Sequence, residues 1–129
     1  MSRTAQNSTL HDQMVKSVAI KYQSDGHSNV RADHIGHING APVNHSGFIP
    51  DVTATHGTTG QYIICEVETA DTVNTQHTYD QLITFRNIAD QMNALLHIGL
   101  PYQSDLIEAK AVIGSWGIKV DQWWYQTAR

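Results

Sequence analysis

Three acidic residues in the middle of the chain have the spacing of a site that could hold a divalent cation. Asp51 follows Pro50, and Glu66 and Glu68 come 14 intervening residues later, with Val67 between them. Alternate residues of a β-strand share a face, so the two glutamates would point the same way in a strand. Hard cations such as Mg²⁺ or Mn²⁺ take carboxylate and carbonyl oxygens, which makes Asp51, Glu66 and the main-chain carbonyl of Val67 candidate ligands. Acids simply solvated at strand ends are the alternative.

A predicted hairpin would bring the first of these acids to the others. Residues 48–56 and 61–68 have strand composition, and Gly57-Thr58-Thr59-Gly60 between them is a turn signal. A four-residue loop closed by a His56–Gln61 pair sets Asp51 opposite Glu66. Like charges opposed across strands are destabilising, and a bound cation would compensate for them.

The rest of the chain predicts one domain that positions this hairpin. Apolar residues at helical spacing indicate helices, and short β-rich runs between turn signals indicate strands. The expectation is an α/β fold with a mixed central sheet flanked by helices, in the order α-β-β-β-α-β-α-β. Residues 1–8 are expected to be a disordered N-terminal segment and 9–129 the single domain. The predicted helices cover 9–24, 77–95 and 104–115, and the predicted strands cover 30–35, 48–56, 61–68, 95–99 and 118–125.

Pro50-Asp51 followed by Glu66-Val67-Glu68 resembles the motif of the PD-(D/E)XK nuclease superfamily, whose fold is restriction-endonuclease-like. The resemblance covers about residues 9–125 and includes the order of elements. It implies Mg²⁺-dependent hydrolysis of phosphodiester bonds in DNA or RNA, with Asp51 and Glu66 binding the metal. Glu68 stands where the family typically has lysine, and in some active members a glutamate there accepts a proton or binds a second metal. Other members with altered motifs have lost catalysis. The alternative is therefore an inactive nucleic-acid-binding or oligomeric interaction module.

The helices contribute further candidates. RecB-like members of the superfamily carry Gln-x-x-x-Tyr on the helix after the motif, and this chain has Gln81-Leu-Ile-Thr-Phe85. Gln81 is thus a candidate to support the site, with a solvent-exposed helix edge as the alternative. Many members also have an acid on the first helix. Asp12 lies off its apolar stripe, where His11 is the polar residue nearest the centre, and for Asp12 and Asp33 surface solvation is favoured.

Histidine is abundant, with eight residues, but its spacing is not that of a zinc site. His34, His37, His45 and His56 include no Cys-x-x-Cys or His-Glu-x-x-His pattern, so loop polarity is the favoured interpretation. Cys65 alternates onto an apolar strand face and is expected to be a buried, inert thiol.

Composition limits the partners. Twelve acids against eight basic residues give a formal charge of −4, which disfavours tight non-specific binding of nucleic acid. No membrane-spanning stretch or signal-peptide core is present, and a cytoplasmic protein is expected. Trp123 and Trp124 must face opposite ways on a terminal strand. One can join the core, and the other needs intramolecular cover, a homodimer contact or a nucleobase.

Overall fold

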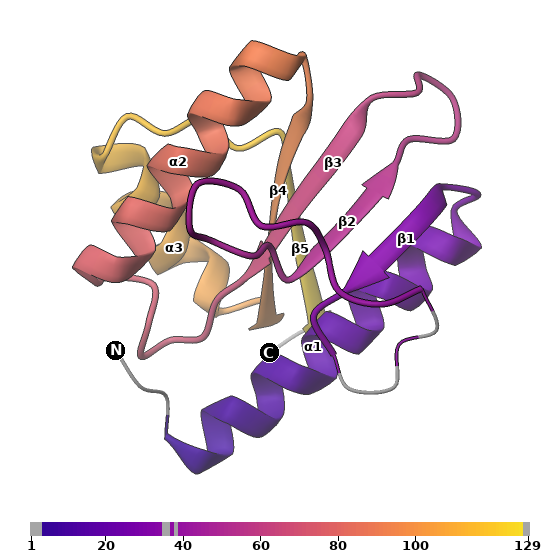
Figure 1. Cartoon of the computed structure of the whole chain (residues 1–129). Coiled ribbons are helices and arrows are strands. Elements are labelled where there is room, and N and C mark those ends of the chain that lie inside the picture. Colours follow the sequence, from indigo (N-terminus) through magenta and orange to yellow (C-terminus); the bar gives the residue numbers. More distant parts are fainter. Residues whose placement is uncertain (1–3, 35–36, 38, 128–129) are drawn as a thin grey trace.

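The computed structural model describes residues 4–34, 37 and 39–127 as a single α/β unit with a five-stranded mixed sheet (Figure 1). The order of elements is the predicted α-β-β-β-α-β-α-β. The helices are α1 (Ala5–Ser24), α2 (Gln76–Met92) and α3 (Asp105–Ser115), and the strands are β1 (Ser28–Ala32), β2 (Val52–Thr55), β3 (Tyr62–Val67), β4 (Leu95–Tyr102) and β5 (Gln122–Thr127).

The strands lie in the sheet in the order in which they occur in the chain, β1-β2-β3-β4-β5. The pairs β1–β2 and β2–β3 are antiparallel, whereas β3–β4 and β4–β5 are parallel. Helices α2 and α3 make the two crossovers that parallel neighbours require. Val52 pairs with Cys65 and Ala54 with Ile63, which confirms the predicted register of the hairpin.

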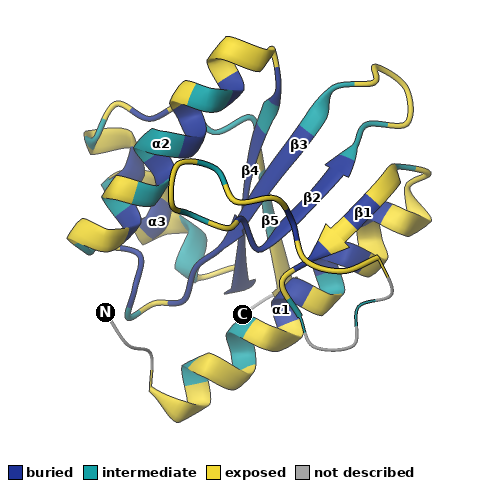
Figure 2. Cartoon of the chain, in the orientation of Figure 1, coloured by how far each residue is buried: buried dark blue, intermediate teal, exposed yellow. Residues whose placement is uncertain are grey.

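Helices cover both faces of the sheet and divide the core into two layers (Figure 2). Val15, Val18 and Tyr22 of α1 pack against one face, together with Ile63 and Cys65 of β3. Leu82 and Phe85 of α2 pack against the other face, where Ile64 points. This alternation follows the strand period of two, and it fixes which face receives Glu66.

The first helix begins earlier than predicted, and residues 5–8 are helical rather than disordered. The Thr4 hydroxyl accepts a hydrogen bond from the Asn7 N–H at 3.1 Å, so Thr4 caps the helix. The Thr4 N–H also donates to Asp71 Oδ2 at 3.1 Å, which ties this end to the segment after β3. Residues 1–3 lie outside the described part of the chain.

Other predicted boundaries were wrong at their ends. Helix α2 ends at Met92, before the predicted end at residue 95, because Asn93 adopts a left-handed conformation with φ 54°. Strand β4 continues through Pro101 to Tyr102, beyond the predicted end at residue 99. Strand β5 begins at Gln122 rather than Ile118. The predicted strand 30–35 shifts toward the N-terminus as β1, the predicted strand 48–56 shortens to β2, and Ile35 lies outside the described residues.

No helix in the described part of the chain is long and apolar enough to cross a membrane.

Candidate functional site

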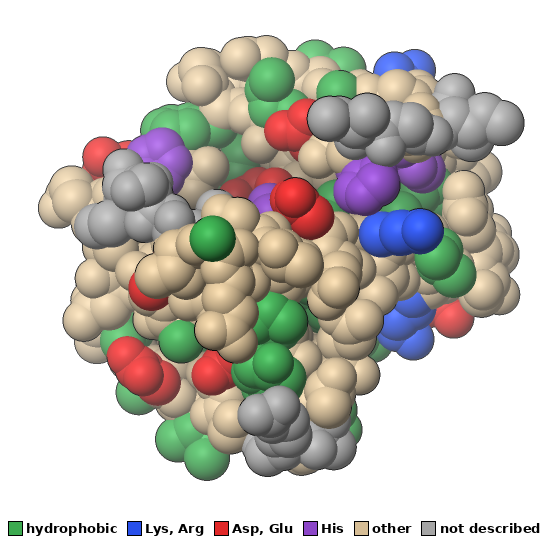
Figure 3. All heavy atoms as spheres, turned by 90° about the horizontal axis from the view of Figure 1, so that it is seen from below, with side chains coloured by type: hydrophobic (Ala, Val, Ile, Leu, Met, Phe, Trp, Pro, Cys, Tyr) green, Lys and Arg blue, Asp and Glu red, His purple; other side chains and the backbone are tan. Residues whose placement is uncertain are grey.

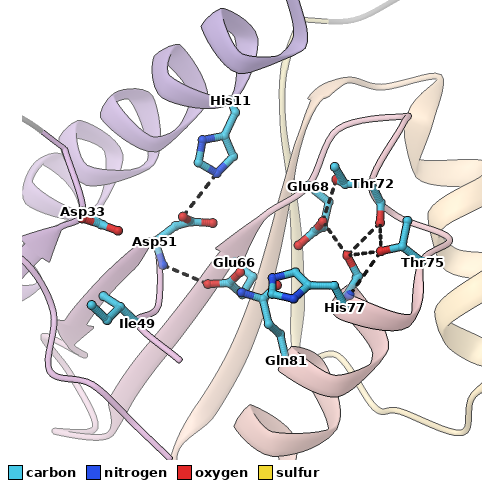
Figure 4. A pocket seen from close by; sticks show the side chains of 11 residues that line it. His11, Asp33, Ile49, Asp51, Glu66, Glu68, Thr72, Thr75, His77 and Gln81 are labelled. Atoms are coloured by element: carbon cyan, nitrogen blue, oxygen red, sulfur yellow. Dashed lines mark hydrogen bonds and ion pairs between the residues drawn. The ribbon is translucent and has the colours of Figure 1, made fainter. Parts of the chain in front are cut away.

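A polar pocket of about 270 Å³ opens where β3 ends and the segment leading into β2 approaches it. In a view from below, acidic and histidine side chains meet in a hollow of the surface (Figure 3). All three predicted acids line the pocket, as does Gln81 (Figure 4). The remaining lining residues are His11, Asp33, Ile49, Thr72, Thr75, His77 and Thr78. The fold therefore brings Asp51, Glu66, Glu68 and Gln81 to one pocket, as the proposed site requires, while their roles stay a prediction.

One hydrogen bond joins Asp51 directly to Glu66, and a second joins Asp51 to the backbone beside Glu66. The Asp51 N–H donates to Glu66 Oε1 at 2.9 Å. Asp51 Oδ2 in turn accepts the Val67 N–H at 2.7 Å. These bonds extend the hydrogen-bond ladder between β2 and β3 by one step, through side chains. They also give hydrogen-bond partners to two buried carboxylates, since Asp51 is only 9% and Glu66 only 2% exposed. For Val67, the structure shows its N–H in this contact, whereas the prediction concerned its carbonyl.

Glu68 is buried, with 1% of its surface exposed, and it is held by hydroxyl groups. Its Oε1 accepts the Thr72 hydroxyl at 2.8 Å and the Thr78 hydroxyl at 3.0 Å. Thr72 lies in the link after β3 and Thr78 in the first turns of α2, so two elements bind one carboxylate oxygen. Solvation at a strand end, the alternative considered for these acids, does not describe Glu68.

Helix α1 contributes a histidine rather than an acid. His11 Nε2 lies 3.2 Å from Asp51 Oδ1, and His11 Nδ1 lies 3.2 Å from Asp12 Oδ1. The Asp12 side chain is 70% exposed, which confirms its predicted solvation. Asp33 is exposed and lies at the rim of the pocket. His11 is the polar residue nearest the centre of the apolar stripe of this helix, and that position in the sequence is the signal that it faces the sheet.

Of the two residues Gln81 and Phe85 in α2, the first lines the pocket and the second lies in the core. Gln81 is partly buried and lines the pocket, one turn of helix after His77 (Figure 4). Phe85 is fully buried among the apolar side chains between α2 and the sheet. The Phe85 ring therefore anchors α2 to the sheet, while the Gln81 side chain shares the pocket with the carboxylates.

The donor chemistry of the pocket suits a hard cation, but the described residues do not form a ready coordination shell. Carboxylates are the preferred oxygen ligands of Mg²⁺. Nevertheless, no three His, Cys, Asp or Glu side chains among residues 4–34, 37 and 39–127 are arranged to hold a metal ion. One oxygen of each of Asp51, Glu66 and Glu68 accepts a protein hydrogen bond, so a cation bound at that oxygen would have to share it.

No lysine or arginine in the described part of the chain lines this pocket. Arg86 instead bonds to Asp90 and Asp121, the latter at 3.0 Å. Burial opposes ionisation of Asp121, but bonds from the Leu96 N–H and Arg86, with the charges of Arg86 and Lys119, hold its pKa below the usual value. Arg86 therefore pairs with Asp121 beside the start of β4 and does not contribute to the lining of the acidic site.

His37, His45, His56 and Cys65 lie outside the acidic pocket. His37 Nε2 contacts the Val30 carbonyl at 3.0 Å, and His45 Nε2 contacts the Tyr62 hydroxyl at 3.0 Å. His56 packs against His27, with ring centroids 4.6 Å apart. Cys65 is fully buried, and burial raises the pKa of its thiol well above the usual value, as expected for an inert cysteine.

The two adjacent tryptophans face opposite sides of the sheet, as predicted. Trp124 packs with the α1 layer and Trp123 with the α2–α3 layer. The Lys21 ammonium lies 4.6 Å from the Trp124 ring centroid, and the Lys110 ammonium lies 5.8 Å from that of Trp123. Both rings therefore have intramolecular cover.

Comparisons with protein-family models, with curated proteins and with solved structures find no match for this chain.

Proposed function

We propose that this chain is a restriction-endonuclease-like domain that hydrolyses phosphodiester bonds of DNA or RNA with Mg²⁺ or Mn²⁺. The observation that carries the proposal is the convergence of Asp51, Glu66 and Glu68 in one pocket, with Gln81 beside them. The antiparallel β2–β3 hairpin followed by a helix and a parallel strand supports the resemblance to PD-(D/E)XK nucleases.

In this proposal Asp51, Glu66 and the Val67 carbonyl would hold the cation. The bound cation would act as a Lewis acid on the phosphoryl oxygens and lower the pKa of a coordinated water. Glu68, held by Thr72 and Thr78, would take the proton from the attacking water. The Gln81 amide would position the water or the phosphate, and His11 would orient Asp51 through its 3.2 Å contact.

Metal binding is tested by thermal unfolding with and without Mg²⁺ or Mn²⁺. The cation should raise the melting temperature of the native chain, because ligands that bind only the folded state stabilise it. Asp51→Asn should abolish this rise. Asp12→Asn is the matched control, because it removes an exposed acid near the pocket and should leave the rise intact. An equal rise in Asp51→Asn would overturn the metal assignment.

Catalysis is tested with purified protein on plasmid DNA, single-stranded DNA and RNA in the presence of Mg²⁺. We expect cleavage that Glu66→Gln abolishes and that Glu108→Gln, on the exposed surface of α3, leaves unchanged. Cleavage that persists in Glu66→Gln would identify a contaminating nuclease.

A second candidate is a non-catalytic module of the same fold that binds nucleic acid or assembles into a homodimer. The scatter of the basic residues favours it, because no described cation offsets phosphate charge at the pocket. The module should bind a labelled oligonucleotide without cleaving it. The homodimer would use the edge strand β5 with Trp123 and Trp124, and sedimentation of the native chain beside Trp123→Ser tests that contact. A monomer at all concentrations would contradict it.

A further inference from the structure

Two turns meet at the end of β2 and β3 that is opposite the acidic site, and each turn brings a histidine to the contact (Figure 1). The α1–β1 turn, residues 25–27, carries His27, and the β2–β3 turn, residues 56–61, begins with His56. Their ring centroids are 4.6 Å apart. Both residues line a pocket of about 520 Å³ together with His97 of β4, and we call it the histidine pocket. The proposed function uses none of these histidines.

A hydrogen bond to the His27 ring joins the two turns. The Gly57 N–H donates to His27 Nδ1 at 2.9 Å. Gly57 also lies so close to the other turn that a Cβ on it would be 2.5 Å from the Gly26 carbonyl oxygen. The turns are therefore in direct contact, and the His27 ring supplies the acceptor for a backbone N–H of its neighbour.

The His56 ring accepts hydrogen bonds within its own turn. The N–H groups of Thr58 and Thr59 donate to His56 Nδ1 at 3.1 and 3.2 Å. A nitrogen that accepts a hydrogen bond carries no hydrogen, so the neutral forms of both rings have theirs on Nε2. An imidazolium carries a hydrogen on each nitrogen and can only donate. Protonation of the two rings therefore sets a donor against three backbone N–H groups.

The β1–β2 ladder is irregular next to these turns. Ser28 pairs with Thr55 and Arg31 pairs with Thr53, and the register shifts between the two pairs. Asn29 lies within this shift and has a left-handed conformation with φ 52°. Strand β1 is also at an edge of the sheet. The contact between the turns therefore supports an edge strand at the point where its pairing is least regular.

Each turn has backbone hydrogen bonds that do not involve an imidazole ring. The His56 N–H donates to the Gln61 carbonyl at 2.8 Å, and the Gly60 N–H donates to the His56 carbonyl at 3.0 Å. In the other turn, the His27 N–H donates to the Tyr22 carbonyl at 3.0 Å. Residues 57–59 are exposed, so water can replace a lost imidazole acceptor. Loss of the ring contacts would therefore separate the turns without unfolding either one.

The surroundings of His27 oppose its protonation while the turns are in contact. Burial and the neighbouring His56 lower the pKa of His27, and Lys21 acts in the same direction whereas Asp25 acts against it. The Lys21 ammonium lies 3.5 Å from Asp25 Oδ2, so these two charges are paired.

The groups that face the two rings from α1 and from the β4–β5 side keep their charge near neutral pH. Burial raises the pKa of the Tyr22 hydroxyl and lowers the pKa of His97 to about 4, so both side chains are neutral. Asp121 also lines the histidine pocket and is paired with Arg86 at 3.0 Å. A titration that stays above about pH 5 therefore leaves Tyr22 and His97 unchanged.

We propose that His27 and His56 form an acid-released clasp, which separates the α1–β1 turn from the β2–β3 turn and frays the start of β1. In the open form His27 regains the ordinary histidine pKa of about 6.5, which is above its pKa in the closed form. The open form thus binds the proton more tightly, and the closed form loses stability as the pH falls below about 6.5. The ratio of open to closed form should rise by up to about tenfold per pH unit, the limit for uptake of one proton. The clasp is independent of the proposed nuclease activity, because neither histidine lines the acidic pocket.

The test is ¹H–¹⁵N spectroscopy of the native full chain from about pH 8 to about pH 5. At the upper end we expect Nε2–H tautomers for both rings. On acidification the Gly57 amide signal should shift with the midpoint of the His27 ring. The ¹H–¹⁵N nuclear Overhauser effect of Ser28 should fall over the same range, because fraying increases backbone motion, whereas that of Ile64 in the central strand should stay constant.

A variant separates the contributions of the two rings. His27→Asn places an amide oxygen where Nδ1 accepts the Gly57 N–H, but an amide does not titrate. It should abolish the pH response of the Gly57 amide and leave the response of the Thr58 amide to His56 intact. His45→Asn is the matched control, because His45 lies outside the histidine pocket, and it should change neither response.

An Nδ1–H tautomer of either ring in the native chain would overturn the proposal. A Gly57 amide that does not follow His27, or that keeps its pH response in His27→Asn, would also contradict it. Equal loss of order at Ser28 and Ile64 would identify global unfolding in place of local release. The tautomer and the titration are measured on the native chain, so they decide the question even if a variant fails to fold.

Discussion

The Asp51 N–H donates to Glu66 Oε1 at 2.9 Å, so a side chain of β3 completes the backbone hydrogen bonding just before β2 begins. The two acids are therefore structural partners as well as candidate ligands. Because Asp51 Oδ2 also accepts the Val67 N–H, the pair locks the hairpin register at the edge of the pocket.

Removing the Asp51 carboxylate should destabilise the fold. Asp51→Ala loses the bond to the Val67 N–H and the contact with His11, and we expect a cost of about 1–3 kcal/mol in the free energy of unfolding. Urea unfolding without added metal measures it. Asp33→Ala, which removes an exposed acid at the rim of the same pocket, should change stability by less than about 0.5 kcal/mol. Equal effects of both substitutions would show that the Asp51 contacts contribute nothing.

The Thr78 hydroxyl should contribute to stability through Glu68. The Thr78 hydroxyl lies 3.0 Å from Glu68 Oε1 and 2.7 Å from the Thr72 carbonyl oxygen, and it can donate its hydrogen to either acceptor. Thr78→Val keeps the shape of the side chain but removes the donor, and it should cost about 1–3 kcal/mol because buried polar partners are left with fewer bonds. The control is Thr84→Val in the same helix, whose hydroxyl contacts only the Asp80 carbonyl one turn earlier and is exposed. A smaller loss for Thr78 than for Thr84 would contradict the role of this bond.

Stability should fall as the pH is lowered from about 6.5 to about 4. Burial lowers the pKa of His97 to about 4, whereas an unfolded histidine titrates near about 6.5. Between these values the unfolded chain binds more protons than the folded chain, so acid favours unfolding. The full difference amounts to at most roughly 3 kcal/mol, and His27 acts in the same direction. His97→Gln should flatten the pH dependence, and exposed His77→Gln should not. An unchanged slope in His97→Gln would refute this origin.

Gly57 should not tolerate a side chain. A Cβ there would lie 2.5 Å from the Gly26 carbonyl oxygen, so the α1–β1 turn and the β2–β3 turn would have to separate. Gly57→Ala should cost roughly 1–3 kcal/mol. By contrast, Gly114 lies in α3 with open space around it, and Gly114→Ala should stabilise the helix by about 0.5–1 kcal/mol. Thermal unfolding of the two variants compares them directly, and a neutral Gly57→Ala would show that the turns are not in contact.

Local patterns predicted the order of elements and the acidic site because both depend on short-range rules. The strand period placed Glu66 and Glu68 on one face, and the loop length fixed the register that brings Asp51 beside Glu66. Strand and helix ends were harder to predict because they depend on long-range contacts. Thr4, for example, starts α1 with help from Asp71, which lies 67 residues later.

Two site features depended on packing that no local pattern contains. The hydroxyl groups of Thr72 and Thr78 meet Glu68 only once α2 has docked on the sheet. The histidine pocket unites His27, His56 and His97 from three separate segments, whereas sequence analysis grouped histidines by their proximity in the chain. His56 accordingly pairs with His27 and not with His34, His37 or His45.

The contact between Tyr22, His97 and Trp124 also bears on the synthesis of the protein. Tyr22 belongs to the first helix and Trp124 to the last strand, 102 positions apart in the sequence. A ribosome must therefore release the chain at least as far as Trp124 before Tyr22 of α1 can acquire this partner. Strands β1 to β4 can pair in the order in which they emerge, because each neighbours its predecessor. Completion of the fold then waits for β5, so a nascent chain that stops short of Trp124 keeps the contacts of Tyr22 with His27 and His97 but lacks its contact with the indole ring.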